Sequence, residues 1–204
     1  MTTNSLSSIP LWRFILPLLF QIGLIMAVPA QAVYILVTGR TVILQTEPVD
    51  PYDLLRGYSQ TLSYDISNYN SLENLPGWNT LLDDKTQDLK MGTKLYVILE
   101  APKKNNLSDK LPPAWKAVKV SDSLPKNLPS NQIALLGVYE YNSIRYDLET
   151  YYFPEDQREK INNDINKLQW QQGKHRPFVV EVKIDERGES IPVSLWIGNN
   201  NYRF

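Results

Sequence analysis

Residues 47–67 read EPVDPYDLLRGYSQTLSYDIS and join a proline-bounded loop to a segment whose two faces differ. Pro48 and Pro51 fix their own φ angles and push the residues before them toward extended geometry, so no helix continues through the loop. From residue 57 to residue 66 the side chains alternate, which predicts a half-buried strand with a hydroxyl-rich face in water. No reaction can be inferred from this stretch. The inward face of the strand is expected to comprise Tyr58, Gln60, Leu62, Tyr64 and Ile66.

Hydrophobic patterns in the rest of the chain predict further strands and one helix. Pro154 is suited to a helix start, Glu155 and Asp156 lie at the positive end of the helix dipole, and apolar residues follow at helical spacing. We expect a mainly β (α+β) fold with one antiparallel β domain of about seven strands and a single amphipathic helix between residues 155 and 171. The predicted strands are 41–46, 57–66, 92–100, 115–120, 132–139, 180–184 and 191–197.

Two connections are also predicted from residue type. Residues 68–88 are rich in Asn, Ser and Asp, which indicates a long loop, with Trp78, Leu81 and Leu82 as its apolar anchors. The run Asp185-Glu186-Arg187-Gly188 indicates the turn of the C-terminal hairpin. Pro192 in the second strand of that hairpin suggests an outer strand, because proline cannot donate to a sheet ladder.

The N-terminal segment is apolar and uncharged between Arg13 and Arg40. A helix of roughly 20 apolar residues crosses the hydrocarbon core of a bilayer, and residues 14–37 are long enough to do so. Two interpretations remain open. The segment is either a retained membrane anchor or a signal peptide cleaved after Ala32, because Ala30-Gln31-Ala32 has the A-x-A form of a cleavage site.

Domain boundaries and location follow from this segment. We expect a membrane anchor or signal segment over residues 1–40, with the lipid bilayer as the partner of residues 14–37, and a soluble β-rich domain over residues 41–204. Basic residues flank the segment equally, so orientation depends on the tendency of a short N-terminal flank to stay in the cytoplasm. The domain is then held at the cytoplasmic membrane on its extracytoplasmic side. The alternative is secretion after cleavage following Ala32.

Two sequence blocks carry a resemblance to a known family. Gly57, Leu62 and Tyr64 have the spacing of a Gly-Asp-Tyr-x-x-Leu-x-Tyr motif, and residues 145–155 (RYDLETYYFPE) are similar to a second block in which glycine is usual at the position of Asp147. The chain resembles the GDYXXLXY family over nearly all of its length, although Tyr58-Ser59 replaces the Asp-Tyr pair of the motif. The resemblance implies a membrane-anchored protein with a retained anchor, and it implies no particular chemistry.

Composition excludes several classes of function. The chain has 21 basic and 22 acidic residues, a net charge of −1 and no Lys/Arg run, which argues against a nucleic-acid partner. It has no cysteine, so disulfides and thiolate chemistry are excluded. Its one histidine, His175, cannot supply a histidine triad or a multi-histidine metal site. We expect neither a metal nor a cofactor.

The candidate binding residues come from both motif blocks and from the loop before the first. A pocket, if one is present, is expected between Arg56, Tyr64, Arg145 and Glu149. A buried tyrosine must find a partner for its hydroxyl, and we expect the hydroxyl of Tyr64 to bond with Arg56 or with the loop at Asp50. The candidate set is Asp50, Arg56, Tyr64, Arg145 and Glu149.

The acidic and aromatic residues of the second block allow two interpretations. Glu149 and Glu155 flank an aromatic run, and a pair of carboxylates could act as acid and base on a glycosidic bond. The simpler interpretation, which we favour, is that Glu149 pairs with Arg145 and that Glu155 caps the helix. The tyrosines of residues 139–153 could line a groove for a sugar or a peptide, but packing in the core and in hairpins explains the same residues and is the interpretation we favour.

These observations lead to three hypotheses for function. The first is a membrane-anchored extracytoplasmic module without catalytic activity, which serves as an accessory or assembly subunit of a membrane complex and has a membrane protein as its partner. The second is a binding module for glycans or lipid headgroups. The third is a carboxylate-dependent hydrolase of the cell envelope. Whether the protein is an enzyme is left open, and the missing acid of the motif argues against it.

Overall fold

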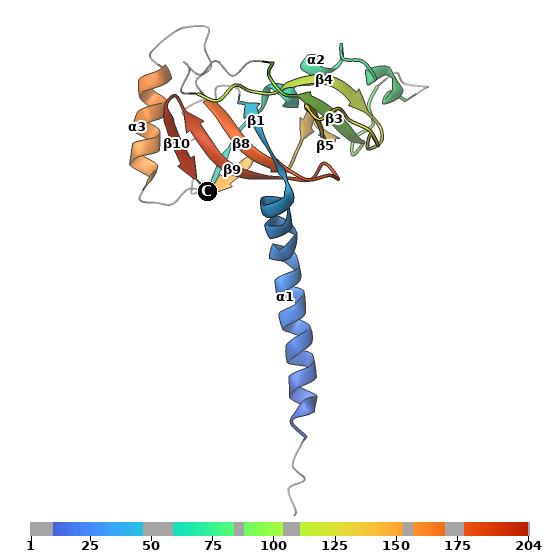
Figure 1. Cartoon of the computed structure of the whole chain (residues 1–204), viewed down its shortest axis with the longest axis vertical. Helices are drawn as coiled ribbons and strands as arrows, with labels where there is room; N and C mark the ends of the chain where they lie inside the picture. The colour runs from blue at the N-terminus through green and yellow to red at the C-terminus, as the bar shows by residue number, and fades with distance from the viewer. Residues whose placement is uncertain are drawn as a thin grey trace, which may run out of the picture.

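The computed structural model describes residues 10–46, 59–83, 88–103, 111–152, 157–169 and 178–203. Within these ranges the chain has a mixed α+β fold with two antiparallel four-stranded sheets and a long N-terminal helix that projects from them (Figure 1). The helices are α1 (Trp12–Thr38), α2 (Tyr69–Leu72) and α3 (Arg158–Gln169).

The first sheet has the strand order β1-β8-β9-β10. Its central hairpin follows from the sequence pattern, because Val180, Val182 and Ile184 are buried while Glu181 and Lys183 between them are half-buried. α3 lies beside β10 at the edge of this sheet (Figure 1). The strands are β1 (Arg40–Gln45), β8 (Phe178–Ile184), β9 (Ser190–Ile197) and β10 (Asn200–Arg203).

The second sheet has the order β4-β3-β5-β6, and a separate two-stranded ladder pairs β2 with β7. β3 lies inside this sheet, between β4 and β5, and four of its seven residues are buried. The bounds are β2 (Ser59–Thr61), β3 (Lys94–Glu100), β4 (Lys116–Ser121), β5 (Gln132–Glu140), β6 (Ser143–Arg145) and β7 (Thr150–Tyr152).

One hydrophobic cluster draws buried residues from both sheets. Val42 and Leu44 of β1, Leu95 and Leu99 of β3 and Ile161 of α3 all belong to it. The predicted anchors Trp78 and Leu81 are 4% and 8% exposed, so this part of the 68–88 prediction is confirmed, while Leu82 is half-buried against the cluster.

Three predictions need correction. Ten strands are present in the described ranges instead of about seven, because β6, β7 and β10 have only three or four residues each and leave no clear periodic signal. The expected strand over 57–66 is shorter: β2 ends at Thr61, and Asp65–Ser67 form a 3-10 turn. The inward positions Leu62, Tyr64 and Ile66 are nevertheless buried.

The third correction concerns Pro192. The strand that carries it, β9, lies between β8 and β10 instead of at the edge of the sheet. β10 pairs only with residues 194–197, however, so Pro192 lies beyond the end of that ladder. On its other side the register with β8 shifts between Glu181 and Val182, opposite Pro192. A bulge and an unpaired edge are the positions at which a sheet accepts proline.

The N-terminal helix bends near its second proline. No single straight helix in the described residues is long and apolar enough to span a membrane, but Trp12–Ala27 and Pro29–Thr38, which meet at 42°, satisfy the requirement together. Proline inside a helix removes a backbone hydrogen bond and clashes with the preceding turn, which accounts for a kink at Pro29. By length and composition, α1 is suited to a signal segment or to an anchor.

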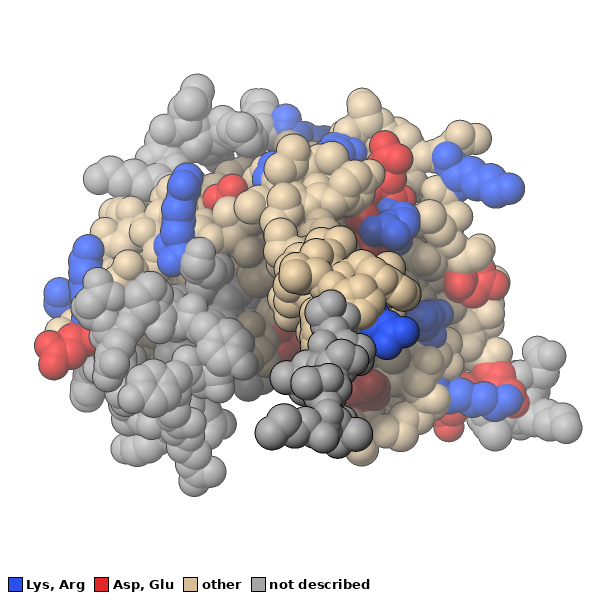
Figure 2. Space-filling model, turned by 90° about the horizontal axis from the view of Figure 1, so that it is seen from below, with Lys and Arg blue, Asp and Glu red and all other residues tan. Residues whose placement is uncertain are grey.

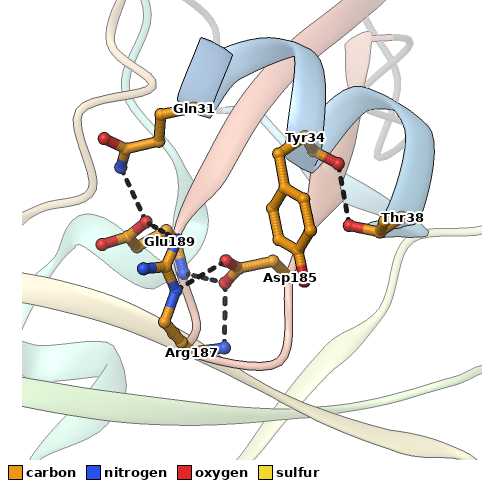
Figure 3. Close-up of polar contacts among 6 residues, drawn as sticks. All are labelled: Gln31, Tyr34, Thr38, Asp185, Arg187 and Glu189. Carbon is orange, nitrogen blue, oxygen red and sulfur yellow. Dashed lines mark hydrogen bonds and ion pairs between the residues drawn. The ribbon is translucent and has the colours of Figure 1, made fainter. Parts of the chain in front are cut away.

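The C-terminal end of α1 is bound to the turn between β8 and β9 (Figure 3). Asp185, which is 4% exposed, accepts hydrogen bonds from the backbone N–H groups of Arg187 and Glu189, at 2.9 Å each, and from the Arg187 side chain at 3.1 Å. Arg187 also donates to Glu189 Oε2 at 2.9 Å. The side-chain amide of Gln31 donates to the same oxygen at 2.7 Å, which connects the helix to the turn.

Close packing supplements this polar contact. Ile35 of α1 is 2% exposed, and Gly39 follows the helix directly. A Cβ atom at Gly39 would lie 2.5 Å from the carbonyl oxygen of Ile35 and 3.1 Å from that of Ile184, so no larger residue fits without a shift of backbone. The ammonium group of Lys183 donates to the carbonyl of Gly39 at 3.1 Å. The helix therefore joins the sheet through a single tightly packed residue.

The same junction reaches the second sheet. The carbonyl of Gly188, in the β8–β9 turn, accepts a hydrogen bond from the N–H of Leu136 in β5 at 2.9 Å. Arg40, the first residue of β1, donates to the carbonyls of Gln132 and Ser130 at 2.8 and 2.7 Å. The base of α1 is thus connected to both sheets.

Candidate functional site

The two sequence blocks that carry the family resemblance lie side by side and hold each other in place. The hydroxyl of Tyr64 donates to the carbonyl of Leu148 at 2.7 Å, and the hydroxyl of Tyr146 donates to the carbonyl of Ile66 at 2.6 Å. Both tyrosines are buried, with 0% and 4% exposure. Each block therefore satisfies a buried carbonyl of the other, which fixes their separation.

Backbone pairing continues this contact in both directions. β2 pairs with β7, and the N–H of Leu62 donates to the carbonyl of Glu149 at 2.8 Å. Further along, the hydroxyl of Ser143 donates to the carbonyl of Ser67 at 3.0 Å. Residues 62–67 are consequently fixed against residues 143–150 along their whole length.

A hollow of about 620 Å³ opens between these two segments. This volume is within the range of pockets that bind small ligands, roughly 300–1,000 Å³. The lining mixes hydroxyl groups, carboxylates, one guanidinium group and one exposed tyrosine. It comprises Leu62, Ser63, Ser67, Glu140, Tyr141, Ser143, Ile144, Arg145, Asp147, Glu149 and Thr150.

Two turns with positive φ angles shape the rim of the hollow. Tyr141 and Asn142, between β5 and β6, have φ angles of 47° and 63°, and Asp147 has a φ angle of 57°. Positive φ is uncommon for residues other than glycine and is best tolerated by Asn and Asp. Asp147 stands where the resemblance places a glycine, and its backbone conformation gives the physical reason for that preference.

Charges at the hollow are mostly paired with one another. The guanidinium group of Arg145 lies 3.1 Å from a carboxylate oxygen of Glu140 and 3.1 Å from one of Asp147. The predicted pair between Arg145 and Glu149 is wrong: no ion pair joins them in the described part of the chain. Glu149 accepts a hydrogen bond from the N–H of Tyr146 at 2.6 Å instead.

The electrostatics of the half-buried Glu149 differ from those of a surface carboxylate. Burial raises the pKa of Glu149, and the nearby charge of Asp147 raises it further, while hydrogen bonds from backbone N–H groups and the charge of Arg145 act in the opposite direction. Burial also raises the pKa of the Tyr146 hydroxyl, with a smaller contribution from Glu149. Burial in the wall of the hollow therefore favours the protonated form of Glu149.

Ser67 is the unusual residue of the lining. It is 5% exposed, and its Oγ atom has no hydrogen-bond partner among the described residues. Its backbone groups are occupied, because its N–H donates to Tyr64 and its carbonyl accepts from Ser143. Buried hydroxyl groups in folded proteins are nearly always paired, so this atom needs an explanation.

The structure brings together only part of the predicted site. Arg145 and Glu149 line the hollow, whereas Tyr64 lies buried behind its wall with Leu148 as its acceptor. Asp50 and Arg56, the expected partners of Tyr64, lie outside the described residues, as do Glu155 and His175.

The predicted aromatic groove is divided between two environments. Tyr146 belongs to the core, as the simpler interpretation expected, and Tyr139 packs against it, but Tyr141 is 85% exposed at the rim. Ser67, Glu140 and Ser143 were missed. The only local signal for them was the Tyr141-Asn142 pair, whose asparagine favours a tight turn. No group of three or more His, Cys, Asp or Glu in the described ranges is placed to hold a metal ion.

A comparison with protein-family models matches the chain to the GDYXXLXY protein family over residues 21–195. The chain belongs to the GDYXXLXY family. Comparisons with curated proteins and with solved structures give no match. In this GDYXXLXY protein, the kept motif positions Leu62 and Tyr64 are both buried: Leu62 lines the hollow and Tyr64 supports its wall from behind.

Proposed function

We propose that this GDYXXLXY protein is a membrane-anchored, extracytoplasmic module without catalytic activity that serves as an accessory or assembly subunit of a membrane complex. The observation that carries the proposal is the junction between helix and domain. α1 ends at Thr38 and β1 begins at Arg40, so one packed glycine separates them.

This junction has a mechanical consequence. A flexible linker would let the domain sample many positions above the membrane. Here Gln31 and Gly39 connect the helix to the first sheet, and the adjoining Arg40 bonds with the second sheet. The bilayer position of α1 therefore sets the position of the domain. A fixed height and orientation suit a subunit that presents one surface to a neighbouring membrane protein.

The junction also favours a retained anchor over a cleaved signal. Cleavage after Ala32 would remove Gln31, whose amide bonds with Glu189, and would interrupt α1 between two of its turns. Glu189 would keep Arg187 as its partner but would lose the contact with the helix. Loss of a typical hydrogen bond costs about 0.5–1.5 kcal/mol, and this bond is exposed to solvent.

Attraction to anionic headgroups has little support at this face. Viewed along α1, acidic and basic side chains are interspersed on the described part of the domain (Figure 2). Juxtamembrane clusters of about 4–8 Lys or Arg are the pattern that binds anionic lipids. The apolar helix is therefore proposed to supply the membrane affinity, which leaves the domain surface for a protein partner.

Fractionation of membranes from cells that express the full chain with a C-terminal tag tests the anchoring. We expect the chain to resist extraction at alkaline pH and the tag to be digested by protease added outside the cytoplasmic membrane. Release of the full chain into the alkaline supernatant, or a tag protected from the added protease, would contradict the proposal.

The role as a subunit has a separate test. Purification of the tagged chain in a mild detergent is expected to recover a second membrane protein at constant stoichiometry. Gly39→Ala, which displaces the helix from the domain, is expected to lower that recovery while the chain remains folded by circular dichroism. A chain that elutes as a monomer with no second polypeptide contradicts the role as a subunit and leaves the anchoring unaffected.

A further inference from the structure

We propose that the hollow between residues 62–67 and residues 140–150 is a binding site for a neutral saccharide. This inference goes beyond the anchoring role and does not depend on it. Three observations support it: a buried hydroxyl with no partner in the described part of the chain, a set of carboxylates that is already neutralised in part, and an exposed aromatic ring at the rim.

The hydroxyl of Ser67 supplies the first observation. Because both backbone groups of Ser67 are occupied, only its Oγ atom lacks a partner in the described structure. An unpaired buried hydroxyl destabilises a folded chain, since it has given up its hydrogen bonds to water. A hydroxyl group can both donate and accept. The Ser67 Oγ atom has almost no accessible surface, so a ligand hydroxyl would complete its bonding once the Ser67 side chain rotates toward the hollow that this residue lines.

The charges of the lining indicate the class of ligand. Arg145, the guanidinium group of the described lining, is held by Glu140 and Asp147, so an anionic ligand would have to compete with two carboxylates for it. Each carboxylate still has free acceptor sites, because its two oxygens offer about four lone pairs. Groups that donate without a negative charge are favoured, and sugar hydroxyls are of this kind. Ser63 and Thr150 add further hydroxyl groups to the wall.

Tyr141 supplies the aromatic surface that a sugar ring requires. Its side chain is 85% exposed, although its φ angle of 47° is one that bulky residues rarely adopt. Tyr141 and Asn142 form the two-residue loop of the β5–β6 hairpin, a turn in which both residues adopt positive φ angles, and this turn places Tyr141 at the rim. The ring offers an apolar face beside polar groups, which matches the alternation of C–H and O–H groups on a saccharide.

The test measures binding of cellotetraose, maltotetraose and chitotetraose to the full chain in detergent by isothermal titration calorimetry. Two variants probe the site. Ser67→Ala removes the unpaired hydroxyl, and Tyr141→Asn removes the ring but keeps a residue that tolerates positive φ. Asn142→Gly is the matched control, because it alters the same turn and leaves both groups in place.

We expect at least one of the three saccharides to bind, each variant to weaken that binding tenfold or more, and Asn142→Gly to retain it within twofold. We also expect Ser67→Ala to unfold at the same temperature as the parent or at a higher one when no saccharide is present. A lower unfolding temperature with unchanged affinity would make Ser67 a structural residue and overturn the assignment. So would the absence of binding by all three saccharides, or binding of spermine in their place. None of these results depends on membrane insertion, so they separate this inference from the proposed function.

Discussion

The junction at the base of α1 and the hollow between the two motif blocks use similar residues in opposite ways. At the junction, Asp185 accepts three hydrogen bonds, and Glu189 is shared by Arg187 and Gln31. At the hollow, Ser67 is as well buried as Asp185 but has no partner for its hydroxyl in the described part of the chain. Complete pairing at the junction stabilises one geometry, whereas incomplete pairing leaves bonding capacity for another molecule.

The largest expected effect is at Tyr64, which supports the wall of the hollow from within the core. Tyr64→Ala should lower the free energy of unfolding by about 3–5 kcal/mol, because it removes a fully buried aromatic ring. Tyr64→Phe should cost only about 1–3 kcal/mol, since it leaves the carbonyl of Leu148 without its donor. Denaturant unfolding of the full chain in detergent measures both values.

Tyr141→Asn provides the comparison for an aromatic residue at the rim. Its ring is 85% exposed, so the change should alter the free energy of unfolding by no more than about 0.5 kcal/mol. Equal destabilisation by Tyr64→Ala and Tyr141→Asn would contradict the placement of Tyr64 in the core and of Tyr141 at the exposed rim.

The next effect is expected at Gly39, where the junction leaves no space. Gly39→Ala should destabilise the chain by about 1–3 kcal/mol, because the new methyl group meets backbone atoms of Ile35 and Ile184. Gly23→Ala is the matched control, since a Cβ atom at Gly23 meets nothing within 4 Å. Thermal unfolding monitored by near-ultraviolet circular dichroism compares the two. If Gly23→Ala is the more harmful change, the junction is not the tightly packed region.

A smaller effect should appear as a pH dependence at Glu149. Burial raises its pKa, so the folded chain retains a proton that the unfolded chain releases at about pH 4.3. The contribution of this group to stability is therefore present at low pH and is lost as the pH rises from about 4.3 through the raised pKa.

Glu149→Gln tests this sign, because glutamine cannot titrate but can still accept the hydrogen bond from Tyr146. The stability of the variant relative to the parent should increase with pH over that window and then level off. Denaturant midpoints measured in steps between pH 4 and pH 8 would reveal the trend. A difference that is constant across these pH values would contradict the raised pKa.

Local sequence patterns predicted those strands and turns whose conformation depends mainly on residues close in the sequence. The alternation of Val180, Val182 and Ile184 predicted β8, and Asp185-Glu186-Arg187-Gly188 predicted the turn that follows. Family membership was also readable, since it depends on the spacing of a few residues. The burial of Leu62 and Tyr64 followed from period two, even though the strand itself ends at Thr61.

Long-range pairings could not be predicted in this way. β2 and β7 lie far apart in the sequence, since Thr61 pairs with Thr150, and each strand has only three residues. The partner of the Tyr64 hydroxyl is a backbone carbonyl at residue 148, and every residue has such a group. That the Ser67 hydroxyl has no partner among the described residues is likewise a property of the assembled fold, because another fold could have satisfied the same serine.

The central claim is that α1 is a permanent part of the folded chain, and the intact mass of the protein purified from membranes tests it most directly. The account predicts a mass that includes the segment up to Ala32, so that the purified chain retains Gln31, the partner of Glu189. A mass that corresponds to a chain starting at Val33 would contradict it.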